Sequence, residues 1–131
     1  MKLKTIYQKL ILEKIRSSEA HRDESSIQTV IDNKRGLGFI PLRGATISDE
    51  EFWDKVKKYK LNTLKVPSSP YNTYIFYRDG YEDDAKELRD IAEKYGGFLS
   101  HEATKEETIR IGELLGYEDS DIEEFVSTRY K

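Results

Sequence analysis

The stretch LNTLKVPSSPYNTYIFY, residues 61–77, holds the two clearest strand candidates of the chain. Residues 73–77 are all β-branched or aromatic, the residue types most enriched in strands. Residues 61–66 form a second candidate, and the segment between the two carries Pro67 and Pro70, which favour a turn. The two segments are therefore expected to pair as an antiparallel hairpin.

Further helix and strand patterns lie on both sides of this hairpin. Ser48 and Glu51 have the spacing of a capping box, which predicts the start of a helix before the hairpin. Apolar residues recur at helical spacing from Ala85 to Tyr95, which predicts a helix after it. Two short strand candidates complete the pattern, at residues 38–43 and 98–100, and Pro41 places the first of them at a sheet edge.

Residues 37–100 therefore have the order β-α-β-β-α-β, which is that of ferredoxin-like folds. In that fold both helices cover one face of a four-stranded antiparallel sheet. An apolar stripe over residues 1–16 predicts an N-terminal helix, and residues 104–129 are expected to form a helical hairpin. The sequence thus predicts a single α+β domain over residues 1–131, a length that suits one hydrophobic core.

The run Ser100-His101-Glu102 contains the residue types of a hydrolytic triad. Successive side chains of an extended segment point to opposite faces, whereas a triad places the imidazole between nucleophile and carboxylate. A capping box of Thr104 and Glu107 explains the segment better, as the start of a helix. Because the chain has no cysteine and only two histidines, no catalytic residue, metal site or cofactor is predicted, and a non-enzymatic protein is favoured.

Charge is distributed unevenly along the chain. Residues 1–66 contain 14 Lys and Arg against 9 Asp and Glu, which gives +5, whereas residues 67–131 contain 8 against 16, which gives −8. Such polarisation is typical of a protein with a charged partner, although solvated helix faces explain it equally well. We expect a non-enzymatic binding or regulatory protein whose acidic half engages a basic surface of a partner protein.

The acidic residues gather near the end of the chain. Residues 108–126 follow a helix-turn-helix pattern, with Gly112 and Gly116 at its small-residue positions. A DNA-binding helix has to neutralise phosphates, so the carboxylates here argue against DNA and favour a basic protein partner, one that itself binds nucleic acid. The predicted protein-binding residues are Glu118, Asp119, Asp121, Glu123 and Glu124.

Binding of single-stranded RNA or DNA is the alternative function. RGLGFIPL, residues 35–42, resembles the first ribonucleoprotein consensus of RNA-recognition motifs, although Leu37 and Leu42 replace aromatic residues of that consensus. Residues 73–77, the best strand candidate, add aromatic residues. These residues stack bases if they line an exposed face of the sheet, and they fill the core if the face is covered. The residues predicted for this function are Lys34, Arg35, Phe39, Arg43, Tyr74 and Phe76.

NKRGLGFIPLRG, residues 33–44, and YIFYRDGYEDDAKELRDIAEKYG, residues 74–96, together resemble small uncharacterised proteins of phages and prokaryotic mobile elements. The resemblance implies a viral or mobile-element accessory protein in the host cytoplasm, and it implies no catalytic residues. Charged residues are abundant while Gln, Asn and Met are few, which is typical of thermophilic proteins. No apolar run reaches the roughly 18 residues that cross a bilayer, so no membrane partner is expected.

Overall fold

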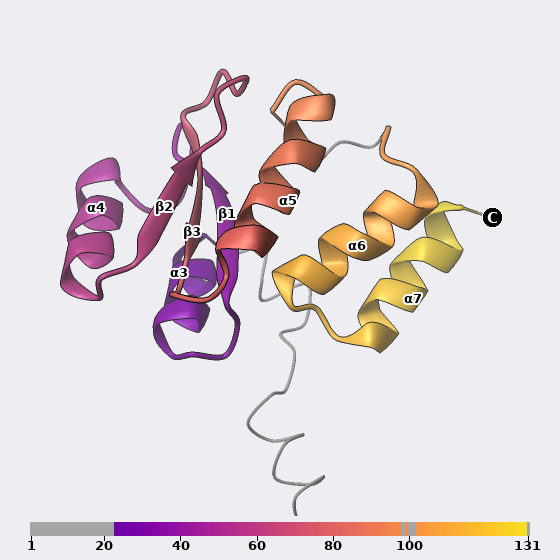
Figure 1. The fold of residues 1–131 in the computed structure, drawn as a ribbon, viewed down its shortest axis with the longest axis horizontal. Coiled ribbons are helices and arrows are strands. Elements are labelled where there is room, and N and C mark those ends of the chain that lie inside the picture. The colour runs from indigo at the N-terminus through magenta and orange to yellow at the C-terminus, as the bar shows by residue number, and fades with distance from the viewer. Residues whose placement is uncertain (1–22, 98, 100–101, 131) are drawn as a thin grey trace, which may run out of the picture.

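The computed structural model describes residues 23–97, 99 and 102–130, so the predicted helix over residues 1–16 lies outside the described residues (Figure 1). The chain folds into five described helices and one small sheet. The helices are α3 (Asp23–Ile31), α4 (Asp49–Lys58), α5 (Glu82–Lys94), α6 (Lys105–Leu115) and α7 (Asp119–Arg129). The strands are β1 (Leu37–Pro41), β2 (Asn62–Lys65) and β3 (Thr73–Tyr77).

The sheet is antiparallel, with β3 in its centre and the strand order β1-β3-β2. β2 and β3 form the hairpin that the sequence predicts, with Leu64 opposite Ile75. β1 pairs with the other side of β3, where Phe39 lies opposite Ile75. Pro41 is thus in an edge strand, as expected for a residue that cannot donate a backbone hydrogen bond.

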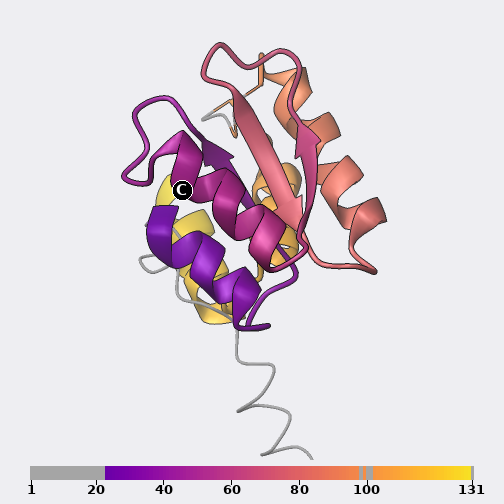
Figure 2. The same cartoon turned by 90° about the vertical axis from the view of Figure 1, so that its left-hand side faces the viewer.

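Both faces of the sheet are covered by helices (Figures 1 and 2). On one face Ile75 belongs to a core cluster with residues of α5 and α6, and on the other face Phe76 belongs to a cluster with residues of α3 and α4. The first cluster consists of Leu37, Val66, Ile75, Ala85, Leu88, Ala92, Leu114 and Leu115. The second consists of Ile27, Val30, Ile40, Leu42, Ile47, Phe52 and Phe76.

The ferredoxin-like arrangement is not what the structure shows. The described sheet has three strands, and Leu99, the described residue of the predicted fourth strand, is not in a strand. The helices α4 and α5 lie on opposite faces of the sheet instead of sharing one. The physical reason lies in β3, because it presents large apolar side chains on both faces and each face has to be kept from water. The coarser prediction, a mixed α+β fold with a small antiparallel sheet, is confirmed.

The helices α6 and α7 pack against each other as a hairpin at the end of the chain. Gly112 permits the close approach, since a Cβ atom there would lie 2.7 Å from Cγ1 of Ile122. At the other end of the hairpin the hydroxyl group of Tyr130 donates to the carbonyl oxygen of Ala103 over 2.7 Å. The same hydroxyl is 2.7 Å from that of Thr108, so the last helix is fixed at both of its ends.

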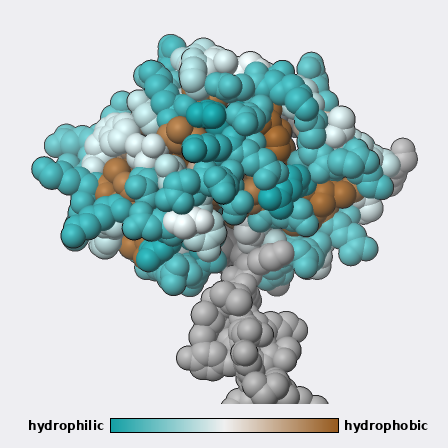
Figure 3. Space-filling view, in the orientation of Figure 1, coloured by the Kyte–Doolittle hydropathy of each residue, from teal (hydrophilic) through white to brown (hydrophobic). Residues whose placement is uncertain are grey.

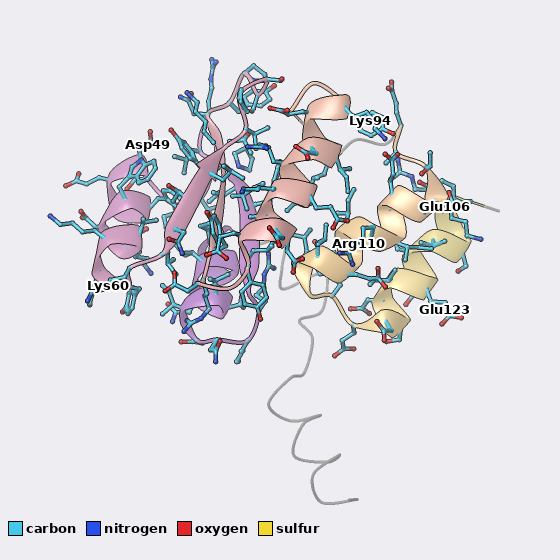
Figure 4. The ribbon with its side chains drawn as sticks, viewed as in Figure 1. Asp49, Lys60, Lys94, Glu106, Arg110 and Glu123 are labelled. Carbon is cyan, nitrogen blue, oxygen red and sulfur yellow. The ribbon has the colours of Figure 1, made fainter. Side chains whose placement is uncertain are left out.

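Glu107 ties the start of α6 to the end of α5. One carboxylate oxygen accepts hydrogen bonds from the Tyr95 hydroxyl and from the backbone N–H of Thr104, and the latter bond, 2.9 Å long, completes the predicted capping box. The other oxygen is 2.6 Å from Nζ of Lys94 (Figure 4). The hydrogen bond from Lys94, followed by those from Tyr95 and Thr104, lowers the pKa of Glu107 to about 2.

This lowered pKa predicts a specific acid sensitivity of folding. A carboxyl group whose pKa is lower in the folded state stabilises the fold above its ordinary pKa, and loses that effect as the pH falls to the folded value. Glu107→Gln is therefore expected to be less stable than the parent at pH 6, and the difference should shrink between about pH 4.5 and pH 2. Urea unfolding at several pH values measures it, with Glu106→Gln, an exposed neighbour, as control. Parallel pH profiles for Glu107→Gln and the parent would refute this role of Glu107.

Candidate functional site

Three loops that are distant in sequence meet at one end of the sheet, at its lower edge in Figure 1. The segment between α3 and β1 supplies Arg35 and Gly36. The segment between β3 and α5 supplies Tyr81, whose ring lies so close to Gly36 that a Cβ atom there would be 2.0 Å away. The turn between α6 and α7 supplies Gly116, where a Cβ atom would be 3.3 Å from Cβ of Arg35. We call this meeting point the Arg35 junction.

Arg35 is an unusual cation, because it is almost completely buried, with 6% of the residue exposed. Its Nε donates a hydrogen bond of 2.7 Å to the carbonyl oxygen of Leu37. Its Nη1 is buried and has no hydrogen-bond partner among the described residues. Burial lowers the pKa of Arg35 to about 10, so the guanidinium still carries its charge at neutral pH. A buried donor on a charged group that has no acceptor is destabilising, and an anion placed against it removes that cost.

Tyr117 is a titratable residue that lies close to Arg35. Burial raises the pKa of Tyr117, and the nearby Arg35 cation opposes that rise. The phenol is therefore neutral at physiological pH and keeps a hydroxyl group that donates or accepts. Tyr81 adds an aromatic side chain, and 39% of this residue is exposed. The Arg35 junction thus combines a buried cation, a half-buried phenol and a partly exposed aromatic residue.

Arg78, which is close in space to the same junction, has a different role. Its backbone N–H donates to the carbonyl oxygen of Gly36 over 2.9 Å. Its Nη1 donates to the carbonyl oxygens of Val30 and Ile31 at 3.1 Å and 3.4 Å. These carbonyls belong to the last turn of α3, where helix backbone acceptors lack helical partners. Arg78 therefore caps a helix, and its charge is used within the fold.

The residues predicted to bind single-stranded nucleic acid are not brought together on one exposed face. Phe76 is completely buried, and its ring is 5.8 Å from that of Phe52 in α4. Tyr74 is half-buried on the same face, with its ring 4.9 Å from that of Trp53. Phe39 is half-buried on the opposite face of the sheet, and Arg35 is buried. Only Lys34 and Arg43 of the six residues are exposed. A helix covers the aromatic face that would have to stack bases.

The predicted protein-binding residues divide into two groups. Asp119 and Glu123 line a groove of about 420 Å³ between α6 and α7, whose apolar floor is made by Ile109, Ile122 and Val126. Apolar surface is visible among hydrophilic residues on this side of the molecule (Figure 3). The other three predicted residues, Glu118, Asp121 and Glu124, do not line the groove.

The described residues give no support for a metal-ion site or for a membrane-spanning helix. Within residues 23–97, 99 and 102–130, no three His, Cys, Asp or Glu side chains are grouped so that they could hold a metal ion. In the same part of the chain, no helix has the length and apolar character needed to cross a membrane.

Sequence reasoning did not predict Tyr81, Tyr117 or the apolar residues of the groove as candidate site residues. Tyr117 directly follows Gly116, the left-handed residue that ends α6, so the sequence explains it fully as part of a helix cap. Arg35 was predicted to contact nucleic acid at the surface, whereas the structure buries it. The sequence nonetheless contained a signal of this burial. Arg35 precedes Gly36, and a glycine is needed at that position because another segment of the chain approaches it closely.

The contrast between the two arginines predicts that the same substitution changes stability little at Arg35 and lowers it at Arg78. Arg35→Met removes an unpaired buried charge together with one hydrogen bond, so the free energy of unfolding should change by less than about 1 kcal/mol. Arg78→Met removes two bonds to helix carbonyls and should lower it by about 1–3 kcal/mol. Urea denaturation measures both. A loss for Arg35→Met as large as that for Arg78→Met would mean that Arg35 is held for stability alone.

Comparisons with known proteins identify a shared fold and no family. No protein-family model matches the chain, and no curated protein matches it by sequence. Among solved structures, the chain is similar to the one described as "Crystal structure of bacterial cysteine methyltransferase effector NleE", with a TM-score of 0.66 and 19% sequence identity. The similarity covers 98% of this chain and 76% of that chain. At this identity the match establishes that the two proteins have a similar fold.

Proposed function

We propose that this protein binds a carboxylate-bearing methyl donor, S-adenosylmethionine, at the Arg35 junction and transfers the methyl group to a thiol of another molecule. The observation that carries the proposal is the buried guanidinium of Arg35, whose Nη1 has no hydrogen-bond partner among the described residues. The reaction class is suggested by the similar fold of NleE, which is described as a cysteine methyltransferase. This goes beyond the sequence, which predicts no cofactor.

The residues of the junction fit the chemical groups of this donor. Its carboxylate is an acceptor for Nη1 of Arg35, and such charge-assisted hydrogen bonds are about twice as strong as neutral ones. Its adenine is a flat ring that stacks on an aromatic side chain, and Tyr81 offers an accessible one. When bound, the donor would supply its sulfonium methyl group to an attacking thiolate, and the thioether S-adenosylhomocysteine would be the leaving group. The sequence contains no cysteine, so the accepting thiol belongs to a different molecule.

The protein's own side chains have a binding and orienting role in this proposal. The hydrogen bond from Nε of Arg35 to Leu37 anchors the guanidinium to β1, and its buried Nη1 has no hydrogen-bond partner among the described residues. A donor group fixed before the ligand arrives loses little entropy on binding, which favours affinity and correct placement. Tyr117, whose phenol is neutral at physiological pH, lies close to the same charge.

Calorimetric titration with S-adenosylmethionine tests the donor site. Arg35→Met should weaken its affinity at least about tenfold, because a hydrogen bond to a charged group contributes about 1.5–3 kcal/mol. Arg43→Met, which removes the same charge from an exposed position, should leave the affinity unchanged. The carboxylate-free analogue 5′-methylthioadenosine should bind the parent and Arg35→Met equally. Failure of the parent to bind the donor, or equal losses for the Arg35 and Arg43 variants, would refute the proposal.

A non-enzymatic binding function, in which the acidic second half engages a basic protein, is the second candidate. It is favoured by the row of carboxylates on α7 and its N-cap. A triple variant with Glu118, Asp119 and Glu123 changed to Lys should lose binding to poly-lysine at about 150 mM salt, where only clustered charges still attract strongly. Retained binding in fluorescence anisotropy would contradict this candidate, and it would leave the donor site untouched.

A further inference from the structure

We propose that the groove between α6 and α7 is the docking surface for a basic amphipathic helix of a partner protein. The proposal deepens the second candidate function, on which it rests, and it does not depend on the Arg35 junction. The α6–α7 groove is lined by Lys105, Ile109, Glu113, Asp119, Ile122, Glu123, Val126, Ser127 and Tyr130. Its apolar floor distinguishes it from an ordinary solvated helix face.

The shape of the groove is fixed by the packing of the hairpin. Gly112 brings α6 against Ile122, so the two helices are close at that level. Tyr130 is held by hydrogen bonds at the other end, where its hydroxyl contacts Ala103 and Thr108. A groove between two anchored helices is largely preformed, so a partner does not have to spend binding energy on opening it.

The charge of the rim selects the partner. Glu113, Asp119 and Glu123 are carboxylates, whereas Lys105 is the only cation among the residues that line the groove. Glu113 lies 3.7 Å from a guanidinium nitrogen of Arg110, which satisfies part of its charge. Glu123 is exposed, lines the groove and makes no ion pair with a described residue. The rim therefore attracts Lys and Arg and repels acidic segments.

The length of the groove suits a short helix. Lys105, Ile109 and Glu113 follow one another at intervals of four residues along α6, so they span about 12 Å. A helix laid along this floor contacts it with side chains at positions i, i+3, i+4 and i+7. The occupant that fits both the floor and the rim is a helix with a Leu or Ile stripe flanked by Lys or Arg.

Two adjacent glutamates provide a matched test of this surface. Glu123 lines the groove and Glu124 does not, yet both are exposed residues of α7. The probe is a labelled synthetic amphipathic peptide of about 14 residues with a Leu stripe and flanking Lys residues. In fluorescence anisotropy at about 150 mM salt, Glu123→Lys should weaken its affinity at least about fivefold. Glu124→Lys should change it less than about twofold, since its charge lies outside the groove.

Further variants separate the apolar and the charged contributions. Ile109→Ser keeps the charge of the groove and should also weaken binding, because it makes the floor polar. A peptide of the same composition whose Leu residues form no stripe should bind more weakly than the probe. Circular dichroism of each variant confirms that the hairpin is intact.

The outcomes distinguish failure of the groove from failure of the binding function. Equal losses for Glu123→Lys and Glu124→Lys, or equal binding of the striped and scrambled peptides, would overturn the groove while the acidic half still binds basic partners. If the parent binds neither peptide and also fails to bind poly-lysine, both the groove and the second candidate function are wrong.

Discussion

The central strand β3 has to bury large side chains on both of its faces, and the rest of the fold follows from that requirement. Ile75 and Phe76 are consecutive, point to opposite faces, and are both completely inaccessible to water. A three-stranded sheet cannot hide two such faces by itself, so each needs its own layer of helices. The helices α5 and α6 cover Ile75, and α3 and α4 cover Phe76. The ferredoxin-like layering leaves one face open and is incompatible with this strand.

Local structure could be predicted from the sequence because its signals lie within a few residues of one another. The β2–β3 hairpin and the cap of Thr104 and Glu107 both appear where the pattern places them. The layering could not be predicted in the same way. Alternating aromatic residues in residues 73–77 are compatible with an open binding face or with a second core, and Phe52, which decides between them, belongs to a different segment of the chain.

The candidate site was still less accessible to sequence reasoning. Arg35 was singled out by its neighbouring glycines, but its burial results from three loops that meet only in the folded chain. In the sequence, Tyr117 is the residue that follows the C-cap glycine of α6, and its sequence neighbours do not indicate that it lies close to a buried cation. The division of the acidic residues of α7 into those that line the groove and those that do not likewise results from packing in the folded chain. The sequence does not distinguish Glu123 from Glu124, and only the packing of α7 against α6 places Glu123 in the groove.

The two arginines near the junction differ in how far the fold satisfies their hydrogen-bond donors. Arg78 gives its hydrogen bonds to the end of α3, so its cost of burial is offset inside the protein. Arg35 is more deeply buried; its Nε donates to Leu37, but its Nη1 has no hydrogen-bond partner among the described residues. A methionine at this position would fill similar space without that cost, and a hydrophobic substitute for a buried ion is often neutral or stabilising. In the proposed function a bound carboxylate satisfies this donor, because its geometry matches that of a guanidinium.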